Sequence, residues 1–113
     1  MATTRLAVLI PAKIAESSQT TQYTSNGIYT IIDKFTATNY DSSARDISVN
    51  VVTASDSAGN QNLIVKAHTL QPSETYTFPE LVGVVLAPGG FISTLASAAT
   101  AVNIRASGRQ VSS

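Results

Sequence analysis

The chain has 113 residues and a mass of 11.8 kDa, which is the size of one domain with a single hydrophobic core. Seven Lys and Arg balance seven Asp and Glu, and charged residues make up only 12% of the chain, so a basic nucleic-acid-binding surface is not expected. The absence of Cys excludes disulfides, thiolate metal sites and a cysteine nucleophile. Polarity comes mainly from 14 Thr and 14 Ser, a composition typical of an all-β protein.

Residues 1–26 are predicted to form an N-terminal arm or edge strand followed by a polar loop. The apolar run that follows Arg5 is short and is interrupted by Pro11, which argues against a signal peptide. No run reaches the roughly 20 apolar residues that cross a bilayer, so no membrane partner is expected. The stretch from Glu16 to Gly27 is rich in Ser, Thr and Gln and predicts a loop that crosses the surface.

Residues 27–113 are predicted to form the β-sandwich domain of what is a single domain overall. Apolar and polar residues alternate with a period of two in short runs, which indicates an antiparallel β-sandwich of jelly-roll or Greek-key type with about 7–8 short strands. The main predicted strands lie at residues 28–38, 47–52, 63–68, 75–78, 91–96 and 102–107. The first two are expected to pair as a hairpin, and a single helical turn is expected at residues 79–82.

Asp33 disturbs the first of these strands. It falls on the same face as Ile31 and Phe35, which are expected to point into the core. A carboxylate on that face indicates a bulge, a strand end or a different register.

No group of residues in the sequence has the pattern of a catalytic, cofactor or metal site. The single histidine, His68, is expected on an outward face beside Lys66, and no serine lies in a nucleophile elbow. Asp41 and Asp46 flank a turn, and the glycine pair at 89–90 lacks the Lys-Ser/Thr of a phosphate loop. We therefore expect neither an enzyme nor a cofactor, and the low charge and apolar N-terminal segment favour adhesion or assembly.

About three quarters of the chain resembles small β-sandwich virion structural proteins of tailed bacteriophages. The resemblance includes a Leu-x-Pro-x-Glu-Thr corner at Leu70–Thr75, and residues 1–26 lie outside it. The segments that carry it are residues 27–39, 42–52, 70–83, 86–89 and 102–108.

Among such proteins, a capsid decoration or cement protein fits best. The resemblance implies a jelly-roll subunit on the capsid exterior, made in the bacterial host cytoplasm. Such a subunit self-associates as a dimer or trimer, bridges neighbouring major capsid protein subunits and stabilises the shell. Nucleic acid is not an expected partner.

In this interpretation the N-terminal segment supplies the candidate protein interface. The candidate interface residues are Leu6, Val8, Ile10 and Ile14. The same residues could instead form an edge strand of the chain's own sandwich. Two further functions stay open: a phage tail, neck or fibre-associated structural protein, and a carbohydrate-binding β-sandwich module that would use Tyr23, Tyr29 and Tyr40.

Overall fold

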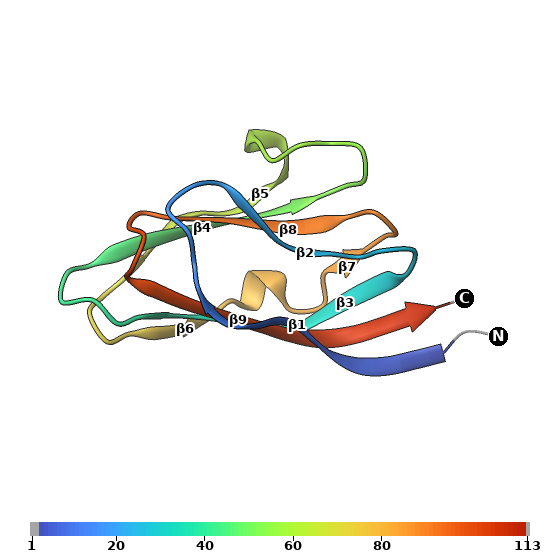
Figure 1. Cartoon of the computed structure of the whole chain (residues 1–113), viewed down its shortest axis with the longest axis horizontal. Helices are drawn as coiled ribbons and strands as arrows, with labels where there is room; N and C mark the ends of the chain where they lie inside the picture. The colour runs from blue at the N-terminus through green and yellow to red at the C-terminus, as the bar shows by residue number, and fades with distance from the viewer. Residues whose placement is uncertain (1–2, 113) are drawn as a thin grey trace.

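The computed structural model describes residues 3–112. Within them, short segments of alternating apolar and polar residues form nine strands, which pack as two antiparallel layers (Figure 1). The strands are β1 (Thr3–Ile14), β2 (Thr20–Thr24), β3 (Tyr29–Asn39), β4 (Arg45–Val52), β5 (Leu63–Leu70), β6 (Thr75–Thr77), β7 (Val85–Leu86), β8 (Phe91–Ala96) and β9 (Val102–Ser112). The 3₁₀ turns η1 (Asn60–Asn62) and η2 (Pro79–Leu81) interrupt the connections, and η2 confirms the predicted helical turn.

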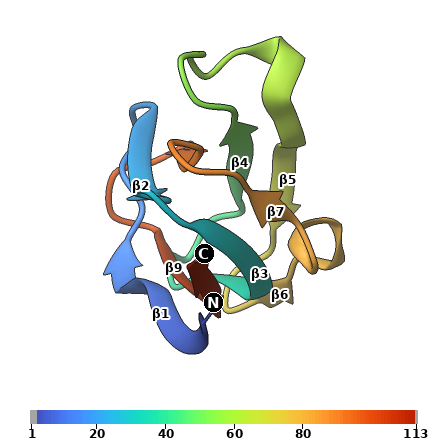
Figure 2. The ribbon, with the colours of Figure 1, turned by 90° about the vertical axis from the view of Figure 1, so that its right-hand side faces the viewer.

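The strand order is that of a jelly roll. Sheet 1 has the order β1-β9-β3-β6, with β7 also paired to β3, and sheet 2 has the order β2-β8-β4-β5. The chain passes repeatedly from one sheet to the other, which produces the two face-to-face layers seen end-on in Figure 2. The predicted antiparallel sandwich is therefore confirmed.

The predicted hairpin between the first two sandwich strands is wrong. β3 belongs to sheet 1 and β4 to sheet 2, so the turn after β3 is a corner between the layers. Asn39 holds this corner from a fully buried position: its Nδ2 donates to the carbonyl oxygens of Ser43 and Leu70, and its Oδ1 accepts from the backbone N–H of Asp41. A side chain that binds three backbone groups replaces the hydrogen bonds that a hairpin would have supplied.

The core lies between the two sheets and is built from inward-facing residues of both. Phe35 and Phe78 form its aromatic centre, with ring centroids 5.3 Å apart at an interplanar angle of 82°. A bulge on β3 shifts the register between Ile32 and Lys34, so Ile32 enters the core and Ile31 turns outward. The irregularity indicated at Asp33 is therefore a bulge, and the expected inward position of Ile31 is wrong.

Part of the polar stretch predicted as a loop is strand β2, which pairs with β8. Its polar side chains and those that precede it bind hydroxyl groups of the neighbouring strand. Gln22 Nε2 donates to Thr94 Oγ1 at 2.9 Å, and Gln19 Nε2 donates to Ser93 Oγ at 2.8 Å. These contacts join polar side chains to polar side chains. The alternation of apolar residues in the sequence therefore gives no sign of this strand.

A polar bridge joins β1 of sheet 1 to β2 of sheet 2. Lys13 Nζ donates to Glu16 Oε2 at 2.9 Å and to Gln22 Oε1 at 2.8 Å, while Gln22 Nε2 donates to Glu16 Oε1. The hydrogen bond from Gln22, followed by that from Lys13, lowers the pKa of Glu16 below its usual 4.5. The bridge therefore holds a charged, partly exposed carboxylate in the connection from β1 to β2.

We expect Gln22→Ala to raise the pKa of Glu16 towards 4.5, because it removes the hydrogen bond that lowers this pKa the most. The stabilisation from this carboxylate is present above the unfolded-state pKa and is lost as the pH falls through the lower folded-state value. NMR titration of the Glu16 carboxyl carbon measures the change. Gln19→Ala is the control, because Gln19 bonds to Asn50 and Ser93 instead, and an unchanged Glu16 titration in Gln22→Ala would contradict the assignment.

Candidate interaction surface

A row of side chains crosses the outer face of sheet 1. The registers place Val85 of β7 beside Ile31 of β3, Ile31 beside Arg109 of β9, and Arg109 beside Leu6 of β1. Side chains directly opposite one another in antiparallel strands point to the same face, so these four project together away from the core. Val8, two residues after Leu6 on the same strand, extends the row along β1.

We call Leu6, Val8, Ile31 and Val85 the apolar face. Leu6 is 84% exposed, and Val8 and Val85 are each 55% exposed. Scattered single apolar residues are normal on a protein surface, whereas aligned ones on neighbouring strands form a patch. The sandwich thus presents an apolar strip on one of its two outer surfaces.

An ion pair lies within this strip. Arg109 Nη2 donates to Asp33 Oδ1 at 2.9 Å and Arg109 Nε donates to Asp33 Oδ2 at 3.1 Å, a two-pronged contact that raises the pKa of the guanidinium above its usual value. The β3 bulge turns Asp33 to this outer face, where it meets Arg109. Each charge neutralises the other, so the ion pair adds no net charge to the apolar face.

An open hollow of about 330 Å³ adjoins the ion pair. Its lining residues are Leu6, Ala7, Val8, Asp33, Ser107 and Gly108. Gly108 brings only backbone to this lining. The surface therefore has exposed apolar side chains with a depression beside them, and both features suit packing against another protein.

The structure places the predicted interface residues in different environments. Leu6, Val8 and Ile14 are exposed on edge strand β1, whereas Ile10 is fully buried in the sandwich core. The register shift between Val8 and Ile10 breaks the alternation, so Ile10 packs inward. Leu6 and Val8 lie on the apolar face, and their role in an interface stays a prediction.

Two residues of the apolar face, Ile31 and Val85, are not among the predicted interface residues. Simple alternation places Ile31 in the core, because the sequence does not locate the bulge that follows it. Val85 lies in the run Val84-Val85-Leu86, where three consecutive apolar residues hide the alternation. Only the pairing of β7 with β3 brings Val85 to the surface.

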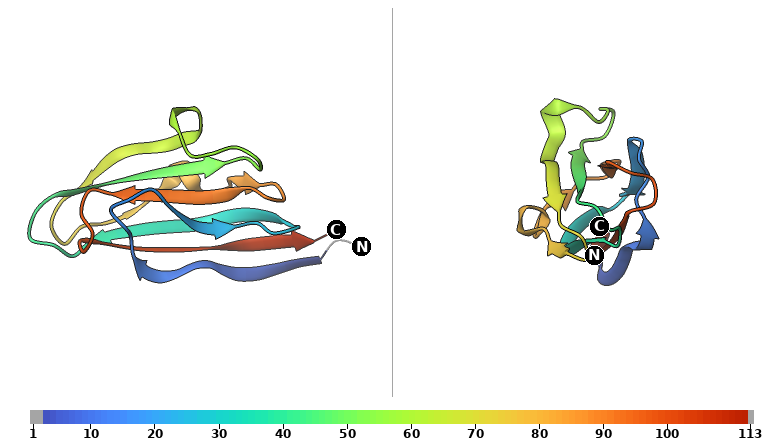
Figure 3. Two further views of the ribbon diagram at one scale, coloured as in Figure 1. Left: turned by 45° about the horizontal axis from the view of Figure 1, so that its top comes forward. Right: turned by 90° about the vertical axis from the view of Figure 1, so that its left-hand side faces the viewer.

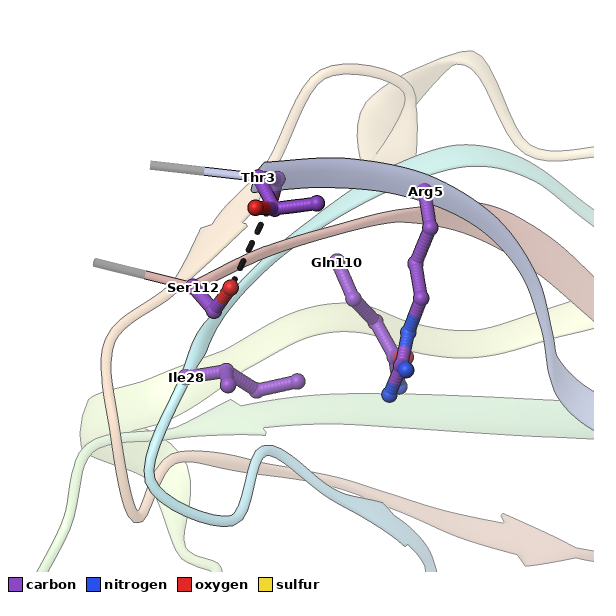
Figure 4. A pocket seen from close by; sticks show the side chains of 5 residues that line it. All are labelled: Thr3, Arg5, Ile28, Gln110 and Ser112. Atoms are coloured by element: carbon purple, nitrogen blue, oxygen red, sulfur yellow. Dashed lines mark hydrogen bonds between the residues drawn. The ribbon is translucent and has the colours of Figure 1, made fainter. Parts of the chain in front are cut away.

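A smaller hollow of about 100 Å³ lies beside the start of β1 and the end of β9 (Figure 4). Its lining residues are Thr3, Arg5, Ile28, Gln110 and Ser112. Arg5 Nε donates to Gln110 Oε1 at 3.0 Å, so the guanidinium already has a hydrogen-bond partner within the chain. Pockets that hold small organic molecules are typically about 300–1,000 Å³, which makes this hollow too small for such a ligand.

His68 does not lie on the outward face as expected. It stacks on Tyr76, with ring centroids 4.0 Å apart, and meets the edge of Phe78 at 5.8 Å. Ala67 has a φ of 47° and forms a bulge that turns His68 towards the core side of β5, opposite the buried Ile47. The histidine is therefore part of an aromatic cluster.

The three tyrosines considered for sugar binding are not brought together. Tyr23 is half-buried and its hydroxyl bonds to Thr30 and Gln110, while Tyr29 and Tyr40 are exposed at opposite ends of β3, roughly 35 Å apart along an extended strand. Within residues 3–112, no three His, Asp or Glu side chains gather as metal ligands. The same residues contain no helix with the length and apolar character needed to span a bilayer.

No family model matches the sequence, and a comparison with curated proteins likewise gives no match. Among solved structures, a chain from the structure of infectious bursal disease virus, Gx strain, aligns with 98% of this chain at a TM-score of 0.52 and 9% sequence identity. The likeness establishes a shared fold. The present chain spans 31% of the length of that viral chain, so it corresponds to one part of it.

Proposed function

We propose that this protein is a structural component of a virus particle, and more specifically a capsid decoration or cement protein of a tailed bacteriophage. The apolar face carries the proposal, since it gives a small sandwich a surface suited to adhesion. The jelly-roll fold shared with a chain from a virus structure supports a place in a virion, and the resemblance of residues 27–108 to phage virion proteins supports the phage assignment.

The proposed mechanism is mechanical and contains no catalytic step. The apolar face packs against the major capsid protein on the capsid exterior, and a self-associated subunit contacts two neighbouring capsid proteins at once. A standard interface buries about 800 Å² per partner, and bridging two sites raises the effective affinity by about 10²–10⁴. The low net charge of the chain suits contacts with protein.

The first test is to locate the subunit in a reconstruction of purified virions. The proposal expects density for a two-layered sandwich on the outer surface of the shell, across the joints between capsid proteins. Density at the tail, neck or fibre would instead support the alternative structural role, and absence of the protein from virions would refute both. A glycan array with the purified chain tests the carbohydrate-binding alternative.

We expect Val85→Asp to abolish binding to particles that lack the protein, because it places an unpaired carboxylate within the proposed contact. Val85 is 55% exposed, so the fold should be retained. Leu95→Asp is the matched control, because Leu95 is an exposed apolar residue on β8 of sheet 2. Co-sedimentation with particles measures binding, and equal binding by both variants would exclude the apolar face as the contact.

A further inference from the structure

We propose that two copies of this chain pair through their β1 strands, with Leu6 opposite Leu6, so that two copies of sheet 1 become one continuous sheet. The partner is a second copy of the chain, and the contact is antiparallel about a two-fold axis normal to the sheet. The inference depends on the edge of β1 and is independent of whether the protein decorates a capsid.

The edge of β1 is open. Within residues 3–112, β9 is the strand that pairs with β1, and Figure 2 shows β1 at the margin of sheet 1. Alternate residues of a strand point their N–H and C=O groups to opposite sides, so half of those in β1 face away from β9. Such a row of unsatisfied groups is a template for another strand.

The other sheet edges, at β6, β7, β2 and β5, are protected by features that natural proteins use against edge pairing. β7 has only two residues. β6 has only three residues, and β2 has five residues with a register shift between Thr21 and Tyr23. β5 carries Lys66 and the bulge at Ala67. These edges can be compared in the two views of Figure 3.

The two halves of β1 differ in how well they are protected against pairing with another strand. The half after Val8 has two register shifts, Pro11 and Lys13, all of which disfavour pairing. From Thr3 to Val8 the register with β9 is unbroken and Arg5 is the one charged residue. Its guanidinium bonds to Gln110 Oε1 and is thereby drawn away from the strand edge.

The sequence of this half selects a second copy as the occupant. In a two-fold antiparallel pair, opposite residues share a face, so the sum of their numbers must be even. Centring the axis on Arg5 would put two arginines opposite each other, which is unfavourable. Centring it on Leu6 puts Leu6 against Leu6, Arg5 against Ala7, and Thr4 against Val8.

The Leu6-centred register also explains the exposure of Leu6. This residue is 84% exposed on an otherwise ordered strand, and pairing would cover it with its own counterpart. The apolar faces of two subunits would then join into one strip that runs across the dimer. Main-chain hydrogen bonds supply affinity, and the Leu6 pair sets the register.

Cysteine crosslinking tests the register directly, because the chain has no cysteine of its own. Opposite residues in antiparallel strands have Cα atoms about 4.5–5.5 Å apart, which is within the range of a disulfide. We expect Leu6→Cys to form a covalent dimer under mild oxidation. Ile64→Cys, on the protected edge strand β5, is the control and should remain mostly monomeric.

A second pair of variants keeps the test independent of any one substitution. Thr4→Cys and Val8→Cys should each crosslink weakly alone but efficiently when mixed, because residue 4 of one copy faces residue 8 of the other. Crosslinking of Leu6→Cys no faster than that of Ile64→Cys, together with no gain on mixing the second pair, would overturn the proposal.

Analytical ultracentrifugation of the unmodified chain provides the equilibrium measurement. We expect a monomer–dimer equilibrium that Leu6→Lys weakens by about 100-fold, since the contact between the two leucines is lost and two ammonium groups are placed opposite each other. Ile64→Lys should leave the equilibrium unchanged. A chain that stays monomeric at high concentration would overturn the inference. Val85→Asp should weaken particle binding and leave the monomer–dimer equilibrium unchanged, so it separates this proposal from the proposed capsid contact.

Discussion

Gly108→Ala is expected to destabilise the fold by about 3 kcal/mol, which lowers the melting temperature by roughly 12 °C. Gly108 lies in the middle of β9, where it pairs with Ala7 of β1 and Ile32 of β3. A Cβ atom there would lie 2.1 Å from the carbonyl oxygen of Ile31 and 3.0 Å from Leu9 Cδ1. Because the first of these neighbours is backbone, the strands themselves must move apart. Thermal unfolding followed by circular dichroism measures the loss.

Gly27→Ala is the control for Gly108→Ala. Gly27 has a φ of 70°, and within the described residues no atom would lie within 4 Å of a Cβ added there. The substitution therefore costs only the strain of a left-handed backbone, about 1 kcal/mol. Equal losses in the two variants would show that close packing around Gly108 is not the cause.

Phe78→Ala is expected to cost about 4 kcal/mol, which is a large part of the stability of a domain of this size. The Phe78 ring is fully buried and meets three other rings, those of Phe35 at 5.3 Å, Tyr76 at 4.8 Å and His68 at 5.8 Å. Its removal leaves a cavity between the sheets and takes away the edge-to-face contacts. Urea unfolding followed by far-UV circular dichroism measures the change.

Tyr40→Ala is the control for the aromatic deletion. Tyr40 is 51% exposed at the corner between the sheets, and its loss should change the free energy of unfolding by less than about 1 kcal/mol. A loss in Phe78→Ala as small as that in Tyr40→Ala would mean that the aromatic cluster does not support the core.

The positions of most strands could be predicted because their apolar residues alternate over regular pairing. β9 is the clearest case, since Val102, Ile104 and Ala106 are all buried as the alternation predicts. β2 could not be found in this way, because Gln and Thr side chains form its contacts with β8. The change of sheet after β3 could not be predicted either, because it depends in part on the hydrogen bond from Asn39 to the carbonyl oxygen of Leu70, a residue distant in sequence.

The candidate surface could be predicted only in part, and the bulges explain why. Leu6 and Val8 precede the first irregularity of β1, so their common outward face follows from simple alternation. The side-chain directions of Ile10 and His68 each depend on a register shift that the pattern does not reveal. For Ile31 the pattern indicates an irregularity at Asp33, but it does not show which residues that irregularity turns outward. Each bulge adds one residue to a strand and thereby exchanges the inner and outer faces beyond it.

The pairing of β1 with β9 also bears on the order of events during synthesis. Thr3 pairs with Ser112, so β1 leaves the ribosome about a hundred residues before its neighbour in the sheet, β9, has been made. Contacts between such distant parts of a chain slow folding, because the entropy of closing a long loop is lost before any contact forms. Sheet 1 is therefore completed only after β9 has been synthesised, and until then β1 remains an unpaired strand in a crowded cell.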